Sequence, residues 1–336
     1  MIKIFKKFSA GLVLSMILGI PLTFATTFGD VDLSNDNYVA IEYLVSTGTL
    51  QGYSDSTFKP KQTINRAELM KVLVAGQGID PDSSTYNNCF PDVSTDWYAK
   101  YVCYAHAQGW VDGYPDNTFK PEQTVNKVEA AKMIVNAYGF TPATEESQAT
   151  SSFMFTDVSS SDWFYGYVMA LTDLNIVERD SSSSYNPSDG MNRGGVAEYI
   201  FRSLVANGTD EEVYSTSSRD EFLTTQGQSS LIPQGLAAIS TVYYDGQVYQ
   251  TESDEYVEVK NEGQGVLNLE GYWIKGSKGD ETYIFSTVEL APGDIIKVYT
   301  NEGEYSFGNE NALWSNDGET ATLYSSDGTI VDTYTY

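Results

Sequence analysis

The chain has 336 residues, of which 46 are Asp or Glu and 19 are Lys or Arg, so its formal net charge is −27. So acidic a chain argues against nucleic acid or an anionic membrane as the principal partner, because both attract basic patches. Apolar residues make up 41% of the chain, which is enough for packed cores, and the length predicts two or more domains.

The first 25 residues have the pattern of a secretory signal peptide. Three lysines precede an apolar run over residues 10–20, and the small residue Ala25 ends the segment. An uncleaved anchor is the alternative, although the apolar run is shorter than the ~20 residues that a spanning helix needs. We therefore expect an exported protein with a signal peptide over 1–25 and no membrane segment after cleavage.

An internal repeat occupies the next part of the chain. Its three copies open with "FGDVD" at 28, "FPDVS" at 90 and "FTDVS" at 155. The first two copies then share "QGYSDSTFKPKQTINRAE" and "DGYPDNTFKPEQTVNKVE" at an offset of 61 residues, whereas the third copy has diverged. Each copy predicts two amphipathic helices, and Gly48, Gly109 and Asn175 stand where a left-handed residue ends the first helix. We expect repeats over 27–80, 88–142 and 153–206 that share one core, because one copy is too small to fold alone.

The second helix of each copy is predicted to begin with a cation. Asn65 and Glu68 form a capping box that makes Arg66 the first helical residue. The same pattern places Lys127 and Arg193 at the first position of the other two helices, with Asn126 and Glu129 as the capping pair of copy two. A positive charge there is disfavoured by up to about 1 kcal/mol. Its repetition therefore favours a functional role.

An anion site is the functional interpretation of these cations. A helix N-terminus offers N–H groups to an anion, and Arg can grip a carboxylate with two hydrogen bonds. Lys127 acts only as a point charge, so we expect the site of copy two to be weaker or differently tuned. The alternative is that the long side chains lean away into surface salt bridges.

The three copies resemble S-layer homology repeats, which anchor bacterial surface proteins to the cell wall. The resemblance rests on the F-x-D-V openings, on "DWYAKYV" and "DWFYGYV", on the GY-x-D-x-TF-x-P turns and on "INRAE" as a form of the family's Thr-Arg-Ala-Glu signature. It implies an all-α, three-pronged pseudo-trimer of helix–loop–helix repeats. Its grooves would bind a secondary cell-wall polysaccharide that carries pyruvate ketals, or peptidoglycan-linked glycan more generally.

The cations and the resemblance together predict the residues that contact the glycan. Trp97 and Trp163 are candidates for sugar stacking or for core packing, and Tyr38 is the candidate platform of copy one, which lacks the Trp. Copy three has Arg179-Asp180 in place of the Gly-Tyr pairs of the other copies, so at most two grooves are expected to be strong. Asn65, Glu68, Asn126 and Glu129 are expected to be structural. The predicted glycan-binding set is Arg66, Lys127, Arg193, Trp97, Trp163, Tyr38, Gly52, Tyr53, Gly113 and Tyr114.

The two cysteines, Cys89 and Cys103, are expected to form a disulfide. They lie close in sequence in a chain expected to be exported, and closing so short a loop contributes ~3 kcal/mol in the chain-entropy model. Two free thiols are less favoured, and a metal site less still, because His106 is the only histidine.

The last third of the chain has the two-residue periodicity of β-strands. Residues 207–237 are polar and predict a flexible linker, with a short helix inside it as the alternative. From 238 to 336, runs such as "DEYVEVKN", "GYWIKGS" and "DIIKVYT" predict an all-β sandwich. These runs and "ALWSNDGETATLYSSDGTIVDTYTY" resemble the lamin-tail domain, a noncatalytic immunoglobulin-like sandwich. Its expected core is Trp273, Val257, Val259, Leu290, Ile296 and Leu323, with Trp314 as a structural plug.

No catalytic motif stands out, so we expect no enzyme, no catalytic residue and no metal site. No cofactor is expected either, beyond weak Ca²⁺ binding by acidic loops. We expect a secreted protein of the cell wall or S-layer, anchored noncovalently through its repeats, whose sandwich is displayed or binds other envelope proteins. A wall-targeted accessory subunit of a carbohydrate-active enzyme and an adhesin are the alternatives.

Overall fold

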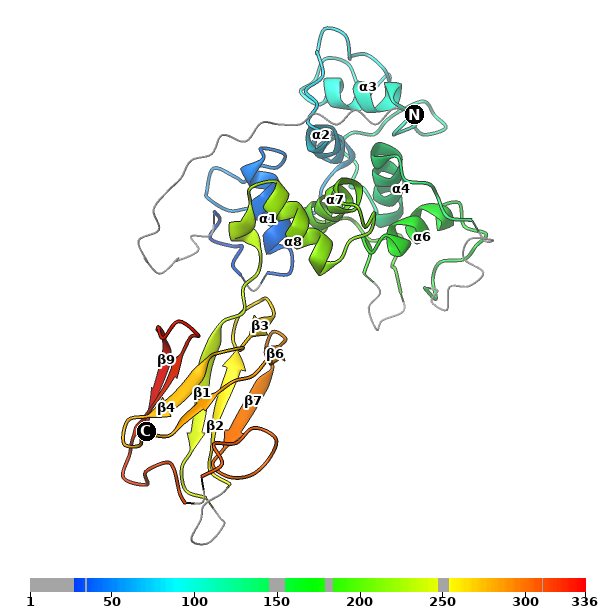
Figure 1. The fold of residues 1–336 in the computed structure, drawn as a ribbon. Coiled ribbons are helices and arrows are strands. Elements are labelled where there is room, and N and C mark those ends of the chain that lie inside the picture. The colour runs from blue at the N-terminus through cyan, green and yellow to red at the C-terminus, as the bar shows by residue number, and fades with distance from the viewer. Residues whose placement is uncertain (1–26, 34, 145–154, 179–183, 247–253, 310) are drawn as a thin grey trace.

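The computed structural model describes residues 27–33, 35–144, 155–178, 184–246, 254–309 and 311–336. The expected signal peptide and the Arg179-Asp180 pair lie outside these residues. Within them, a helical region is followed by a β-rich region (Figure 1), which confirms the predicted fold class. None of the described helices is long and apolar enough to cross a membrane.

Each repeat contributes a first helix and a second helix. Gly48, Gly109 and Asn175 follow the first helices with φ of 75°, 74° and 56°, so the predicted left-handed helix ends are confirmed. The first helices are α1 (Tyr38–Ser46), α3 (Ala99–Ala107) and α6 (Tyr165–Asp173). The second helices begin at the three cations and are α2 (Arg66–Gly76), α4 (Lys127–Tyr138) and α7 (Arg193–Gly208).

The N-caps explain why the second helices begin where they do. The side chain of Asn65 accepts a hydrogen bond from the Glu68 N–H, and the Glu68 carboxylate accepts one from the Asn65 N–H. Asn126 and Glu129 repeat this capping box. In copy three Asn192 caps the helix alone, because Gly195 has no side chain to return the bond.

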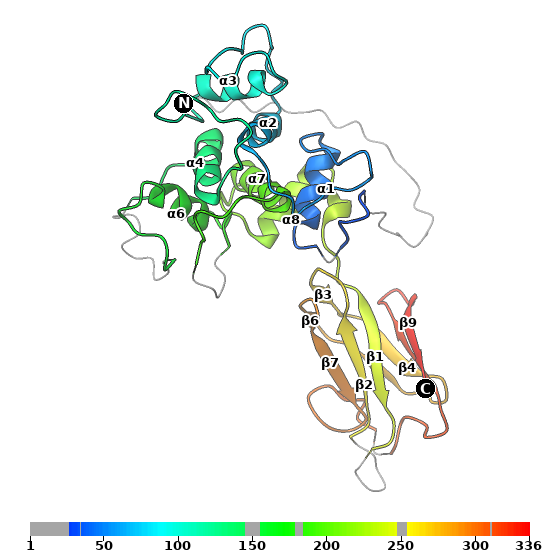
Figure 2. The ribbon, with the colours of Figure 1, turned by 180° about the vertical axis from the view of Figure 1, so that it is seen from behind.

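The helices pack across repeats in a closed ring. Each first helix packs on the second helix of the preceding repeat: α3 on α2, α6 on α4 and, closing the ring, α1 on α7. The second helices α2, α4 and α7 contact one another at the centre, with the first helices outside them (Figures 1 and 2). The apolar face of every helix is therefore buried by a neighbouring repeat, as expected for units too small to fold alone.

A triangle of backbone hydrogen bonds joins the three repeats just before their second helices. The Ile64 N–H donates to the Met191 carbonyl at 3.0 Å, the Met191 N–H to the Val125 carbonyl at 2.9 Å, and the Val125 N–H to the Ile64 carbonyl at 3.1 Å. All three side chains are buried. Each repeat thus donates to one neighbour and accepts from the other.

The stretch expected to be a flexible linker contains a packed helix. α8 (Thr216–Thr225) and a 3₁₀ turn (Ser229–Leu231) follow α7, and Phe222 and Leu223 are buried in the helical core. The Phe222 ring lies 5.4 Å from that of Tyr43 in α1. The polar composition of residues 207–237 predicted a linker. Two adjacent apolar residues, Phe222 and Leu223, are nevertheless enough to pack this short helix against the helical core.

Cys89 and Cys103 form the predicted disulfide, with their Cα atoms 5.4 Å apart. The bond joins the segment that precedes α3 to the middle of that helix.

The β-rich region is a sandwich of antiparallel sheets. One sheet has the order β1-β2-β7, the other β5-β4-β8-β9, and β3 pairs with β6 (Figure 1). The strands are β1 (Ala237–Tyr243), β2 (Tyr256–Asn261), β3 (Leu267–Asn268), β4 (Trp273–Gly276), β5 (Thr282–Ile284), β6 (Glu289–Leu290), β7 (Ile295–Tyr299), β8 (Thr320–Tyr324) and β9 (Ile330–Thr335).

Most of the predicted sandwich core is confirmed, and Trp273 is the exception. Val257, Val259, Leu290, Ile296, Leu323 and Trp314 are all buried. Trp273 was expected there too, but it is only partly buried because the next residue, Ile274, faces the core with 0% exposure. Successive residues of a strand point to opposite faces, so Trp273 lies on the outer face of its sheet.

Candidate functional site

The cation at the start of each second helix reaches into the turn of the following repeat. The Arg66 Nε donates to the Phe119 carbonyl at 2.9 Å, and the Lys127 Nζ donates to the Tyr185 carbonyl at 2.9 Å. The Arg193 Nε completes the ring by donating to the Phe58 carbonyl at 2.8 Å. Each of these cations therefore links its own repeat to the next one, and we call the three side chains struts. The carbonyl oxygens offset the free-energy cost of a positive charge at a helix N-terminus.

The N–H groups that were expected to be free for an anion are already bonded. Those of Arg66 and Ala67 donate to the carbonyls of Gln123 and Pro121, each at 3.0 Å. The first two N–H groups of α4 and α7 make the corresponding bonds to carbonyls of repeats 3 and 1. The expectation of an anion held by these first N–H groups is thus wrong, because the turn of the next repeat fills that place.

An aspartate at the opening of each repeat holds the turn that supplies the carbonyl. In repeat 1 the Asp30 carboxylate accepts hydrogen bonds from the N–H groups of Phe58 and Lys59, both at 2.8 Å. Asp92 and Asp157 do the same in the other repeats. The F-x-D-V opening is therefore a structural part of the site.

Within the described part of the chain two grooves, A and B, lie between the repeats, and each is lined by residues of all three repeats. Groove A has a volume of about 520 Å³ and is lined by Arg66 of repeat 1, by repeat 2 from Trp110 to Pro115 with Glu129 and Lys132, and by Trp163 of repeat 3. Groove B has a volume of about 290 Å³ and is lined by Lys127 of repeat 2, by repeat 3 and by Asp36 and Asn37 of repeat 1. The repeat relates groove A to a third place, around Arg193, Tyr53, Lys71 and Trp97, which we call groove C from this equivalence; there Arg193 contacts the Tyr53 ring and Lys71 contacts the Trp97 ring.

In groove A, Arg66 is tightly held. Its side chain is 4% exposed, it lies 3.5 Å from the Glu129 carboxylate, and burial lowers the pKa of its guanidinium. The Tyr114 ring is contacted by Arg66 at 4.7 Å and by Lys120 at 4.1 Å. Burial and the hydrogen bond to Glu129 raise the pKa of the Tyr114 hydroxyl to about 12. This phenol therefore stays neutral and donates to Glu129.

Groove C repeats this arrangement with residues of repeats 3 and 1. Arg193 contacts the Tyr53 ring at 5.0 Å, and Lys59 contacts the same ring at 4.2 Å. A second guanidinium nitrogen of Arg193 donates to the Gln51 carbonyl at 2.7 Å. Grooves A and C thus share one arrangement. In each, an arginine and a lysine contact the ring of the same tyrosine.

The two predicted tryptophan platforms face solvent, whereas the predicted tyrosine platform does not. Trp97 is 55% exposed and Trp163 is 60% exposed, so packing does not account for either indole. Tyr38 is 8% exposed, and it is the first residue of α1, as the buried Ala99 is of α3. Trp97 and Trp163 stand two residues before α3 and α6, and Asp36 has that place before α1, so groove B has no tryptophan and Tyr38 is not a platform there.

The glycines of the two Gly-Tyr pairs have a packing role. A Cβ at Gly52 would lie 2.0 Å from the Phe28 ring, and one at Gly113 would lie 2.6 Å from the Phe90 ring. These phenylalanines belong to the F-x-D-V openings. The contact explains both glycines without a ligand.

Sequence reasoning missed a second cation in grooves A and C. Lys132 lines groove A together with Trp163, and the Lys71 Nζ lies 5.8 Å from the Trp97 ring. The two lysines are 61 residues apart, so the repeat offset already relates them. The equivalent position in α7 is Glu198, which reverses the charge in groove B.

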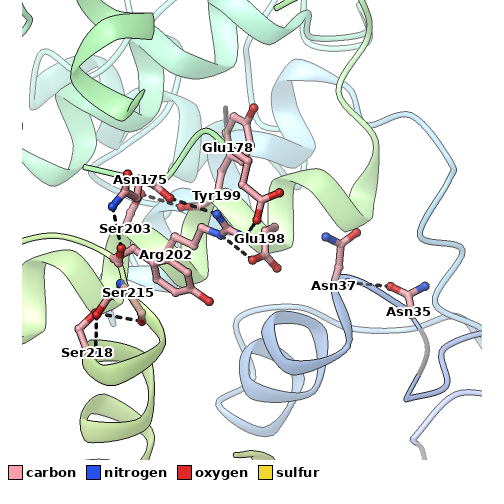
Figure 3. Close-up of polar contacts among 11 residues, drawn as sticks. Asn35, Asn37, Asn175, Glu178, Glu198, Tyr199, Arg202, Ser203, Ser215 and Ser218 are labelled. Atoms are coloured by element: carbon pink, nitrogen blue, oxygen red, sulfur yellow. Dashed lines mark hydrogen bonds and ion pairs between the residues drawn. The ribbon is translucent and has the colours of Figure 1, made fainter. Parts of the chain in front are cut away.

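An internal network of charges lines groove B (Figure 3). The Arg202 guanidinium pairs with Glu198, at 2.6 Å, and with Glu178, and it also donates to the Asn175 carbonyl. These carboxylates outweigh burial and raise the pKa of Arg202, while burial raises the pKa of Glu198. Asn37 points toward Glu198 from repeat 1 (Figure 3). Groove B therefore differs from grooves A and C in three ways. Its helix begins with Lys127 instead of an arginine, it has no tryptophan, and Glu198 stands where the other two grooves have a lysine.

Comparison with known families accounts for both regions. The S-layer homology domain matches residues 27–70, 90–131 and 155–197, and the Lamin Tail Domain matches residues 233–336. The chain is built from three S-layer homology repeats and a lamin tail domain. The repeats identify it as a cell-surface protein associated with the cell wall or S-layer, and the S-layer homology domain is a binding domain for cell-wall polymers.

The curated relatives share the repeats within much longer proteins. The chain is 27% identical to the middle cell wall protein of Brevibacillus brevis over 54% of its own length and 16% of the relative's. It is 34% identical to a surface layer protein of Brevibacillus choshinensis, over 37% of this chain and 12% of that one. It is 28% identical to an amylopullulanase of Thermoanaerobacterium thermosulfurigenes, over 54% of this chain and 10% of that one. The chain thus spans less than a fifth of each of these relatives.

Proposed function

We propose that the S-layer homology repeats anchor this protein by binding an anionic, pyruvylated wall polysaccharide in grooves A and C. The exposed indole and the nearby lysine that these two grooves share carry the proposal. Trp163 or Trp97 would cover the apolar face of a sugar ring. Lys132 or Lys71, assisted by the positive potential of Arg66 or Arg193, would attract its carboxylate; Lys132 is paired at 3.2 Å with Asp112, in an exposed ion pair weak enough for a ligand carboxylate to replace.

Groove B contributes little to this anchoring. Its cation is Lys127, a point charge without the forked geometry of the two arginines, its indole is replaced by Asp36, and Glu198 brings a negative charge that repels an anion. Arg202, the other cation of this groove, is engaged by two carboxylates. The protein would therefore hold the wall at two places, which raises its avidity above that of either groove.

Cosedimentation with wall sacculi tests the anchor. The full chain is expected to pellet with sacculi and to stay in solution after acid extraction of their secondary polymer. The Trp97→Ala/Trp163→Ala variant is expected to lose at least tenfold in affinity, because both indoles are exposed and dispensable for packing. Lys61→Ala, an exposed lysine outside the three grooves, is the matched control. Equal binding by the double variant and the control would refute the proposal.

The noncatalytic role of the chain is part of the same proposal. Similarity to an amylopullulanase is confined to about half of this chain. It supports one rival proposal, in which the chain is a wall-targeted subunit of a carbohydrate-active enzyme. Turnover of wall polysaccharide or of starch by the purified full chain would support that rival. Saturable wall binding without release of reducing sugar would support the anchor.

A further inference from the structure

The outer face of the sheet β5-β4-β8-β9 carries an apolar row that crosses all four strands. Ile284 is paired with Trp273, Trp273 with Tyr324, and Tyr324 with Ile330. Directly paired residues of antiparallel strands share a face. Ile284 is 65% exposed and Ile330 is 59% exposed, and the rings of Trp273 and Tyr324 stack with their centroids 3.7 Å apart. The row is therefore an ordered, solvent-facing apolar surface.

A row of hydroxyl groups runs beside the apolar row. Lys275 is paired with Thr282 on one side and with Thr322 on the other, and Thr322 is paired with Thr333. Beyond it, the Oγ1 atoms of Thr320 and Thr335 lie 2.8 Å apart. Strands that are about 4.8 Å apart make each four-strand row about 14 Å long. The face thus offers hydroxyl donors and acceptors in line with apolar side chains.

These two rows carry no carboxylate, although the chain has a formal net charge of −27. Lys275 is their single charged residue, and its Nζ lies 3.4 Å from the Asp280 carboxylate at the edge of the sheet. The outer face of the opposite sheet differs, since Glu258, Lys260 and Lys297 lie on its strands β2 and β7. A face without net charge suits an uncharged partner and gives no electrostatic attraction to the anionic polymer proposed for the grooves.

The size of the face decides between a protein partner and a polymer strand. A stable protein interface takes about 20–30 residues from each side. The rows described here supply ten residues, which is too few for such an interface but enough to support a narrow chain. A pyranose strand has apolar C–H faces and a fringe of hydroxyl groups, which match the two rows.

We propose that this face binds a neutral polysaccharide strand, laid across the four strands of the sheet. The sugar C–H groups pack on Trp273, Tyr324 and the two isoleucines, while Thr322, Thr333 and Lys275 hydrogen-bond the sugar hydroxyls. The site is separate from the grooves and does not depend on the anchoring proposed above. The protein would then join an anionic wall polymer to a second, uncharged glycan.

Affinity electrophoresis of the full chain tests the site. The gels contain soluble neutral polysaccharides, namely xyloglucan, mixed-linkage β-glucan, galactomannan, dextran and the neutral fraction of the wall. Retarded migration is expected with at least one of them. Thr322→Asp, which puts a carboxylate in the middle of the hydroxyl row, is expected to weaken that retardation at least tenfold. Thr241→Asp, on the opposite sheet and paired with Glu258, is expected to leave it unchanged.

The outcomes separate this site from the anchor. Trp97→Ala/Trp163→Ala is expected to migrate like the wild type in the neutral gels, even where it no longer pellets with sacculi. The proposal is overturned if no polysaccharide retards the wild type, or if Thr322→Asp and Thr241→Asp weaken retardation equally. It is also overturned if Thr322→Asp abolishes self-association in sedimentation and leaves retardation intact. Circular dichroism and the unfolding midpoint confirm that Thr322→Asp is folded.

Discussion

Arg66 shows how a residue that looks like a ligand group serves the fold. Its unfavourable position at a helix N-terminus predicted that Arg66 has a role beyond helix formation. The capping box predicted the first residue of the helix correctly, since α2 begins at Arg66. The sequence could not reveal its partner, because the Phe119 carbonyl belongs to the next repeat and any carbonyl in the chain is an equal candidate.

Arg66→Ala is expected to destabilise the helical region by about 3 kcal/mol, because it leaves the Glu129 carboxylate and the Phe119 carbonyl without their buried cation. Arg66→Lys is expected to cost less, since Lys127 makes the equivalent bond in repeat 2. Urea unfolding measures both. Lys61→Ala, an exposed lysine, should change stability by less than about 0.5 kcal/mol. A neutral Arg66→Ala would contradict the role of Arg66 as a strut.

In the turns of repeats 1 and 2, single aspartates are expected to make the stability of the fold depend on pH. The Thr118 hydroxyl donates to the Asp116 carboxylate at 2.6 Å and holds the pKa of that carboxyl below its ordinary value of 3.8. Asp55 and Thr57 repeat this in the first turn. A carboxyl whose pKa is lowered by folding contributes stability above its unfolded pKa, and that contribution is lost as the pH falls through its folded pKa.

Wild type is therefore expected to lose its advantage over Asp116→Asn when the pH is lowered from 6 to 2. Thermal unfolding of both proteins across that range measures the difference. The amide of the variant keeps the turn's hydrogen-bond acceptor without the charge, so the comparison isolates the carboxylate. Asp210→Asn, an exposed aspartate after α7, is the control. A difference that stays constant from pH 6 to pH 2 would contradict the shifted pKa.

At the scale of elements, the pairing of helices was beyond reach of the sequence. Periodicity gives every helix an apolar face but does not say which neighbour covers it. The alternation of inward and outward residues placed most of the sandwich core, yet it failed at Trp273 because a large indole was assumed to point inward. The helix α8 was hidden for the opposite reason, since only Phe222 and Leu223 interrupt a polar stretch.

The contact of α1 with α7 has no direct chain connection, unlike the contacts of α2 with α3 and of α4 with α6. Arg202 and Glu198 lie at this place, with side chains 11% and 14% exposed. A double-mutant cycle of Arg202→Met and Glu198→Gln is expected to give a coupling energy of about 1–3 kcal/mol. The exposed pair Lys132–Asp112 should give less than about 1 kcal/mol in the same measurement. Equal values would mean that the network does not stabilise this closure.

At the scale of the molecule, the ring makes the three repeats one cooperative unit. Solenoid repeats contact only their neighbours in sequence and tolerate the loss of a terminal unit. Here repeat 3 covers α1 with its helix α7, packs its helix α6 on α4 of repeat 2, and supplies Met191 to the central triangle of hydrogen bonds. Its removal therefore exposes apolar surface on both other repeats.

Deletion of residues 155–231 is expected to unfold the whole helical region and leave the sandwich folded. The two regions have separate hydrophobic cores, so each has its own contribution to a calorimetric scan. In the full chain the helical region is expected to unfold in a single transition, with equal calorimetric and van't Hoff enthalpies. The deletion should abolish that transition and reduce helical circular dichroism beyond the loss of α6, α7 and α8. Retention of α1 to α4 as a folded unit would show that the repeats are independent after all, and that the struts at Arg66, Lys127 and Arg193 join units that can stand apart.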